Sequence, residues 1–120
     1  MADFTPAPIK AQIPFSLLES IDVRLGTIER VADVAGSKKL VKLIVSFGDH
    51  TRNILAGLKT ERADPQALVG RQALFVVNLE PRKMAGEISE GMLFDIGHAD
   101  GLTPALAVPE HPLPPGARVG

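Results

Sequence analysis

The sequence has no cysteine, tryptophan or tyrosine, and five phenylalanines are its only large aromatic side chains. Without cysteine, disulfide frameworks, thiolate nucleophiles and cysteine-based zinc sites are excluded. With so few rings, a nucleic-acid binder could gain little from stacking bases on aromatic side chains. The formal net charge is −1 over 120 residues, so any phosphate-binding surface must gather its positive charge locally.

Long apolar runs are also missing. No stretch approaches the roughly 20 apolar residues that a membrane-spanning helix needs, and the first residues show no basic segment followed by an apolar one, as a secretory signal would. We therefore expect no contact with the membrane and a cytoplasmic location, which the lack of cysteine also fits. The length predicts a single domain that can bury a core.

Residues typical of catalysis are scarce. The three histidines, His50, His98 and His111, have no carboxylate or second histidine at helical ligand spacing, so we expect them in solvated turns. The nucleophile motif Gly-x-Ser-x-Gly, the phosphate-binding Gly-rich loop and the zinc motif His-Glu-x-x-His are all absent. The sequence predicts no enzyme, no catalytic residue, no metal site and no cofactor.

The start of the chain predicts an arm and a short helix. Residues 1–14 contain three prolines and no clear period, so we expect a flexible N-terminal arm, followed by one folded domain over residues 15–120. Ser16 and Glu19 have the spacing of a capping box, with Ser16 as the N-cap of a helix of one or two turns.

The rest of the chain is patterned mainly as β-strands. Strands are expected at residues 21–34, 40–47, 51–56, 73–79 and 91–96, and Gly26 interrupts the first at a bulge or bend. Asp64, Pro65 and Gly70 mark a short helix between the third and fourth strands. The proline-rich segment after Gly101 can form only short edge strands. We predict an all-β fold with short helices, a five-stranded OB-fold Greek-key barrel with an N-terminal helix and a C-terminal extension.

Positive charge gathers at two places that a barrel could bring to one mouth. Lys38, Lys39 and Lys42 stand at the entry to the second strand, and Arg82 and Lys83 stand in a predicted loop after Leu79. Together they would form a local patch for phosphates. The alternative is a solvated, lysine-rich surface.

A second group of residues follows the Arg82 loop. Ser89 offers a hydroxyl to a phosphate or sugar, Gly91 allows close approach of a ligand, and Met92 offers a flexible apolar contact. Glu90 would repel phosphate, so we expect it to pair with a basic neighbour. Met84 and Met92 could instead fill core volume.

Several stretches of the chain resemble one family, the tRNA-binding domain. They lie at residues 22–26 (DVRLG), 39–40 (KL), 52–58 (RNILAGL), 64–71 (DPQALVGR), 77–84 (VNLEPRKM) and 88–92 (ISEGM). This OB-fold module is appended to bacterial methionyl-tRNA synthetases and occurs in EMAP II-like and CsaA-like proteins. The resemblance spans about Phe15 to Gly120. One departure is residues 36–40, GSKKL, where the family usually reads Asn-Ala-Asp-Lys-Leu.

The resemblance implies a non-catalytic protein that binds the tRNA elbow by shape and backbone. Carried over by position, Lys39, Arg82, Lys83, Ser89 and Met92 would form the tRNA face, with Lys38 adding charge. It also implies a homodimer that uses the N-terminal helix and the C-terminal extension, with an aminoacyl-tRNA synthetase as a possible partner. Two alternatives remain, a CsaA-like secretion chaperone that holds unfolded preproteins and a dimerisation module with little RNA affinity.

Overall fold

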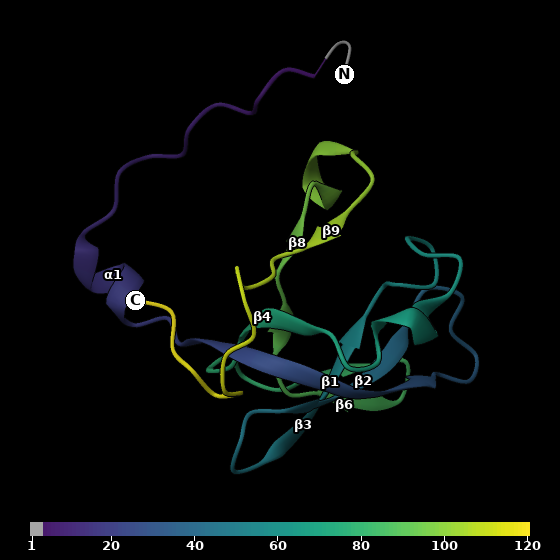
Figure 1. The fold of residues 1–120 in the computed structure, drawn as a ribbon. Coiled ribbons are helices and arrows are strands. Elements are labelled where there is room, and N and C mark those ends of the chain that lie inside the picture. Colours follow the sequence, from purple (N-terminus) through teal and green to yellow (C-terminus); the bar gives the residue numbers. More distant parts are fainter. Residues whose placement is uncertain (1–3) are drawn as a thin grey trace.

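A computed structural model of the protein describes residues 4–120, and the first three residues of the predicted arm lie outside this part of the chain. Within the described residues, regular structure begins at Phe15, and residues 4–14 are exposed and form no helix or strand (Figure 1). The elements in chain order are α1 (Phe15–Glu19), β1 (Val23–Asp33), β2 (Val41–Ser46), β3 (Thr51–Ala56), η1 (Pro65–Leu68), β4 (Gln72–Val76), β5 (Arg82–Met84), β6 (Glu87–Ser89), β7 (Met92–Leu93), β8 (Asp95–Ile96), η2 (His98–Asp100) and β9 (Ala105–Leu106).

Five antiparallel strands in the order β3-β2-β1-β4-β7 make the central sheet. The long β1 joins its two halves, because residues 23–27 pair with β4 and residues 27–33 pair with β2. β3 meets β6 and β7, and the backbone N of Glu90 donates to the carbonyl of Asn53 at 2.8 Å, which nearly closes the sheet on itself. The predicted five-stranded OB-type barrel with an N-terminal helix is confirmed.

Gly26 has a different role from the predicted one. It keeps regular register opposite Ala73, and the irregularity of β1 lies further on, between Ile28 and Arg30. A β-carbon on Gly26 would lie 2.4 Å from Cγ1 of Val45, far inside van der Waals contact. The prediction of a bulge at this glycine is therefore wrong, and close packing inside the barrel explains the residue.

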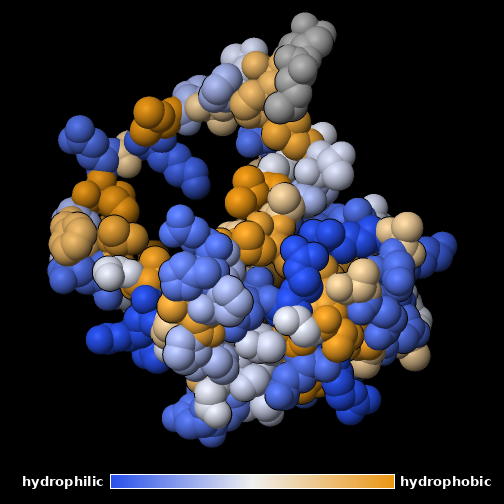
Figure 2. Space-filling model, in the orientation of Figure 1, coloured by the Kyte–Doolittle hydropathy of each residue, from blue (hydrophilic) through white to orange (hydrophobic). Residues whose placement is uncertain are grey.

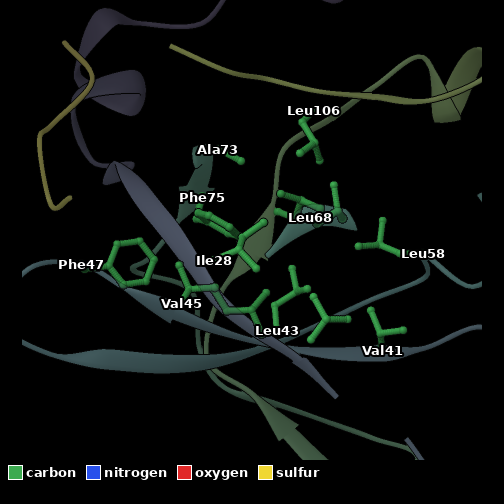
Figure 3. Close-up of a cluster of buried hydrophobic side chains, with 13 residues drawn as sticks. Ile28, Val41, Leu43, Val45, Phe47, Leu58, Leu68, Ala73, Phe75 and Leu106 are labelled. Atoms are coloured by element: carbon green, nitrogen blue, oxygen red, sulfur yellow. The ribbon is translucent and has the colours of Figure 1, made fainter. Parts of the chain in front are cut away.

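The barrel interior is filled by alternate residues of its strands. β2 shows the pattern most clearly, with Val41, Leu43 and Val45 buried and the residues between them partly exposed. The rings of Phe47 and Phe75 meet edge to face with centroids 5.6 Å apart. Leu68 of η1 is 2 % exposed and packs into the same cluster (Figure 3), so η1 covers one end of the barrel.

The two expected helices differ in how they begin. η1 lies between β3 and β4 as predicted, as a 3₁₀ turn with Pro65 in its first turn, and the Asp64 side chain accepts from the backbone N of Gln66 at 3.1 Å. In α1, Ser16 is already helical, the N-cap is Pro14, and no side chain caps the helix. The capping-box prediction is wrong, because the helix begins two residues earlier than predicted and the proline at its N-cap has no side-chain oxygen.

Residues 82–89 form a hairpin where a basic loop was expected. β5 pairs with β6, with Arg82 opposite Ser89 and Lys83 opposite Ile88. Ala85 and Gly86 connect the strands, with φ of 50° and 80°. Two successive positive φ angles are typical of the tight turn whose twist matches a hairpin. The sequence analysis did not predict this turn, because its first position carries alanine and not the glycine or asparagine typical of a positive φ.

The last predicted strand, residues 91–96, is two strands in the structure. β7 belongs to the barrel, whereas β8 pairs with β9 in a small separate sheet (Figure 1). The proline-rich tail then returns to the barrel, where Gly116 N donates to the carbonyl of Leu25 and Val119 N to that of Val23. The tail thus covers the edge of β1. None of the helices in residues 4–120 is long and apolar enough to cross a membrane.

Candidate nucleic-acid interface

Two adjoining cavities lie beside the hairpin and the third strand. The smaller, of about 110 Å³, is lined by Leu55, Leu79, Glu80, Arg82, Met84, Ser89, Gly91 and Met92. The larger, of about 600 Å³, is lined by Lys39, Leu55, Ala56, Gly57, Leu58, Thr60, Glu61, Met92, Leu93, Phe94, Asp95, His98 and Ala99. Because Leu55 and Met92 line both, the cavities meet at these residues. We call the pair of cavities the binding groove.

The hairpin separates the two cations that were expected to act together. Both Arg82 and Lys83 are exposed, but only Arg82, with Met84, lines the smaller cavity. Successive residues of a strand point to opposite faces, so Lys83 lies on the other face of the hairpin. The structure brings Arg82 to the groove and leaves Lys83 at its outer edge.

The lysines before β2 are divided in the same way. Lys39 lines the larger cavity, whereas Lys38 is exposed and lines neither. The segment is held by the hydroxyl of Ser37, which accepts from the backbone N of Leu40 at 3.0 Å, and by Lys59 N, which donates to the carbonyl of Lys39 at 3.0 Å. A fixed backbone at this point positions Lys39 at the groove.

Ser89 closes the barrel instead of facing the groove with a free hydroxyl. It is 4 % exposed, and its Oγ accepts from the backbone N of Leu55 at 3.0 Å and donates to the carbonyl of Gly91 at 3.0 Å. A buried hydroxyl with both a donor and an acceptor partner has little left for a ligand. The geometry favours a structural role, and the RNA contact expected of Ser89 stays a prediction.

Met92 stands at the junction of the two cavities. Its side chain is 47 % exposed although it belongs to barrel strand β7, whose other residue, Leu93, is buried. The alternative that Met92 fills the core is therefore wrong. A flexible apolar side chain in this position can contact a base or a ribose.

Two carboxylates beside the groove, those of Glu87 and Glu90, are held by partners. Glu87 Oε1 lies 3.1 Å from Lys42 Nζ, so this acid is neutralised. Glu90 Oε1 accepts from the backbone N of Asn53 at 2.9 Å, and its carbonyl accepts from Arg52 Nη1 at 3.1 Å. The prediction that a basic side chain pairs with the Glu90 carboxylate is wrong. The backbone N–H of Asn53 is its partner instead, and this bond fixes Glu90 against β3.

One group in the groove had no signal in the sequence. Glu61 is only 10 % exposed, and its Oε2 lies 3.2 Å from Nδ1 of His98. Burial, and then a hydrogen bond with the side chain of Asp95, raise the pKa of Glu61 to about 7, so a protonated Glu61 can donate to Asp95. More than thirty residues separate Glu61 from the other two, so only the fold joins them.

Asp22 shows the opposite shift on another side of the barrel. Arg24 Nε donates to its Oδ1 at 2.6 Å, and this bond lowers the pKa of Asp22. Arg52 was also not predicted to matter for structure, yet its Nη1 donates to the carbonyls of Val77 and Glu90 and ties β3 to two later segments. Within the described residues 4–120, no three acidic or histidine side chains are grouped to hold a metal ion.

Comparison with known proteins agrees with this architecture. The family model described as "Putative tRNA binding domain" matches residues 23–118. A methionyl-tRNA-synthetase-related (MetRS-related) protein from Pyrococcus horikoshii superposes with a TM-score of 0.84 and 31% identity, over 92% of this chain and 100% of that one. The CsaA chaperone of Bacillus anthracis str. Ames gives 0.78 and 27%, again over 92% and 100%. The CsaA chaperone protein of Picrophilus torridus gives 0.79 and 27%, over 91% and 100%. This chain belongs to the tRNA-binding domain family.

Proposed function

We propose that this protein is a non-catalytic tRNA-binding protein that holds the RNA backbone along the binding groove. Arg82 and Lys39 would contact phosphates from its two cavities, and Met92 would contact a sugar or base between them. Lys83 and Lys38 would add charge at the edges. The observation that carries the proposal is the meeting of the two cavities at Met92, since it joins cations that are 43 residues apart in the chain into one surface.

Two cations support an anionic ligand. Lys39 and Arg82 line the cavities, together with the acids Glu61, Glu80 and Asp95, and Glu87 beside the groove is neutralised by Lys42 at 3.1 Å. Such contacts position a nucleic acid without reading its sequence. With only a few cations, we expect modest affinity and a shallow dependence on salt.

Titration of bulk tRNA at several salt concentrations tests the proposal. We expect saturable binding at low salt, and the double variant Arg82→Ala, Lys83→Ala should weaken it and reduce the slope of log K against log salt by about 2. The matched control is Lys10→Ala, Arg71→Ala, which removes the same charge from the arm and from a cavity that shares no residue with the groove. Absence of saturable binding at low salt, or equal losses in both variants, contradicts the proposal.

A dimer is part of the proposal. Phe15, Leu17 and Leu18 of α1 are 70 %, 51 % and 56 % exposed, and apolar side chains gather around this helix at the left of Figure 2. A helix that buries none of its residues needs a further surface to cover it. We expect sedimentation velocity to give a dimer and Leu18→Asp to shift it to a monomer. A monomeric wild type at micromolar concentration would contradict this.

The second candidate is a chaperone for unfolded preproteins. It is favoured by the likeness to two CsaA proteins at 27% identity and by the same exposed apolar side chains on α1. Suppression of the aggregation of an unfolded model protein separates the two. If suppression persists in excess tRNA and tRNA itself binds weakly, the chaperone is the better description.

A further inference from the structure

The loop between β1 and β2, residues 34–40, carries Lys39 to the groove with little packing of its own. Val34 at its start is buried, but residues 35, 36, 38 and 39 are exposed, and Gly36 has a φ of 79°. A glycine and few buried contacts leave a loop free to move unless hydrogen bonds hold it. The position of Lys39 therefore depends on the bonds made to the backbone of this loop.

A lysine after the third strand supplies several of these bonds. Lys59 Nζ donates to the carbonyl of Ser37 at 2.7 Å and, at 3.4 Å, to that of Val34. It also forms an ion pair at 2.5 Å with Oδ1 of Asp33, the last residue of β1. The backbone N of Lys59 donates to the carbonyl of Lys39 at 3.0 Å. One residue thus holds the loop at its start, its middle and its end.

The ammonium group of Lys59 is committed to the protein. An ammonium group has three N–H donors, and the three oxygens just named take them. The larger cavity of the groove is lined by its neighbours, Leu58 and Thr60, and not by Lys59 itself. A cation that points away from the groove with its donors occupied has none to offer a phosphate, so Lys59 can act on RNA only through the loop that it holds.

A fixed loop makes Lys39 a better ligand for phosphate. Ordering a mobile segment during binding lowers affinity, and a segment that is already ordered in the free protein avoids this loss. The bonds from Lys59 go to backbone carbonyls, which every side chain leaves in place. They can therefore hold residues 36–40, GSKKL, although the asparagine and aspartate usual in the family are missing there.

We propose that Lys59 is a positioning residue for RNA binding, whose ammonium group clamps the β1–β2 loop so that Lys39 meets a phosphate in the larger cavity. The inference rests on the proposed function and names the residue that sets one of its cations. Lys59 would then raise the affinity for RNA without touching the RNA.

Titration of bulk tRNA at low salt with charge-balanced variants tests this role. Lys59→Met removes the ammonium group, and the double variant Lys59→Met, Asp33→Asn removes one charge of each sign, so its net charge equals that of the wild type. We expect about two- to tenfold weaker binding in both. Asp33→Asn alone is the control, because Lys59 keeps its bonds to the loop carbonyls, and it should bind at least as tightly as the wild type. Wild-type affinity in the double variant would show that Lys59 acts through its charge alone and would overturn the proposal.

Double-mutant cycles distinguish a positioning residue from a direct phosphate contact. In a Lys39→Ala protein, Lys59→Met should weaken binding by less than about twofold, because the cation that it positions is gone. In an Arg82→Ala protein the loss should keep its full size, since Arg82 stands on the separate β5–β6 hairpin. A full loss in both backgrounds overturns the proposal and leaves the proposed function standing. No saturable binding by the wild type removes the proposed function, and this inference with it.

Backbone dynamics of the free protein give a readout that does not need RNA. In Lys59→Met, the ¹H–¹⁵N heteronuclear NOE of residues 35–39 should fall below the wild-type values, whereas that of the turn at residues 85–86 should not change. Equal order of the loop in both proteins overturns the proposal. If Lys59→Met does not fold, Ser37→Ala loosens the same loop, because the Ser37 hydroxyl accepts from Leu40 N at 3.0 Å. It should show the same coupling to Lys39→Ala, and full additivity overturns the proposal in the same way.

Discussion

Replacing Ser89 by alanine separates a structural serine from an RNA-contacting one. The wild-type hydroxyl serves two backbone groups of the barrel seam, since it accepts from Leu55 N and donates to Gly91 O, both at 3.0 Å. Leu55 is 6 % exposed and Ser89 4 %, so the Leu55 N–H is shielded from bulk water. The variant therefore leaves this buried N–H without its partner and removes one donor from the partly buried carbonyl of Gly91.

The expected cost follows from those two groups. An unsatisfied buried N–H costs about 1–3 kcal/mol, and a carbonyl that loses one of its partners costs less, so Ser89→Ala should lower the free energy of unfolding by about 2–4 kcal/mol. That is a large share of the roughly 5–15 kcal/mol by which domains of this kind are stable. With a urea m-value of about 2 kcal/mol/M, the unfolding midpoint should fall by about 1–2 M.

Urea unfolding and tRNA titration on the same samples provide the assay. Ser46→Ala is the matched control, because Ser46 Oγ accepts from Gly48 N at 3.2 Å in an exposed turn, and its removal should change stability by less than about 0.5 kcal/mol. Folded Ser89→Ala, measured well below its midpoint, should bind tRNA within twofold of wild type. Unchanged stability together with a clear loss of tRNA affinity would refute the reasoning and restore Ser89 as a direct RNA contact.

Three further perturbations test other parts of the structure. Gly26→Ala places a β-carbon 2.4 Å from a side-chain atom of β2, so it should lower the free energy of unfolding in urea by about 1–3 kcal/mol. Gly57→Ala is the control, because no atom lies within 4 Å of the new carbon and stability should not change. Equal effects of the two variants would contradict the packing argument. Glu87→Gln releases Lys42 from its ion pair and removes a negative charge near the groove. Such a pair is worth about 0.5–1 kcal/mol, so tRNA affinity at low salt should rise about two- to fivefold. An unchanged affinity would place Lys42 outside the interface. The pKa of Glu61 is raised from 4.5 to about 7, so the folded state binds this proton more tightly than the unfolded state. The free energy of unfolding should therefore fall as pH rises from about 4.5 to 7, and this fall should be smaller in Glu61→Gln. Identical pH profiles for the two proteins would refute the assignment.

The strand pattern of the chain was readable because barrel strands are rich in apolar, β-branched side chains. Residues 40–47 were predicted as a strand from such a run, and in β2 Val41, Leu43 and Val45 face the interior. The pair Asp64-Pro65 predicted the turn η1 through its own local chemistry, a side-chain cap and a fixed φ. Both features depend on neighbours in sequence, although the capping box at Ser16, which is equally local, was predicted wrongly.

Features that depend on a second segment were predicted poorly. The hairpin at residues 82–89 carries alanine at a positive φ, which only its pairing with β6 makes favourable, and this pairing places Arg82 and Lys83 on opposite faces. Ser89 looked available for a ligand because its partners, Leu55 N and Gly91 O, become its neighbours only when the barrel closes. Gly26 was predicted to mark a bulge or bend, whereas a glycine is required there by the side chain of Val45 on β2.

The sequence by itself determined the class of fold, the family and the types of side chain available, because alternating burial, turn residues and a set of family motifs are all written along the chain. Tertiary structure alone decided which of those side chains share a surface. It joined Lys39 to Arg82 across Met92, withdrew Ser89 into the barrel seam, and placed Glu61 against Asp95 in a cavity. The physical reason is that burial, charge pairing and shape arise between segments far apart in the chain, and chain order does not record those distances.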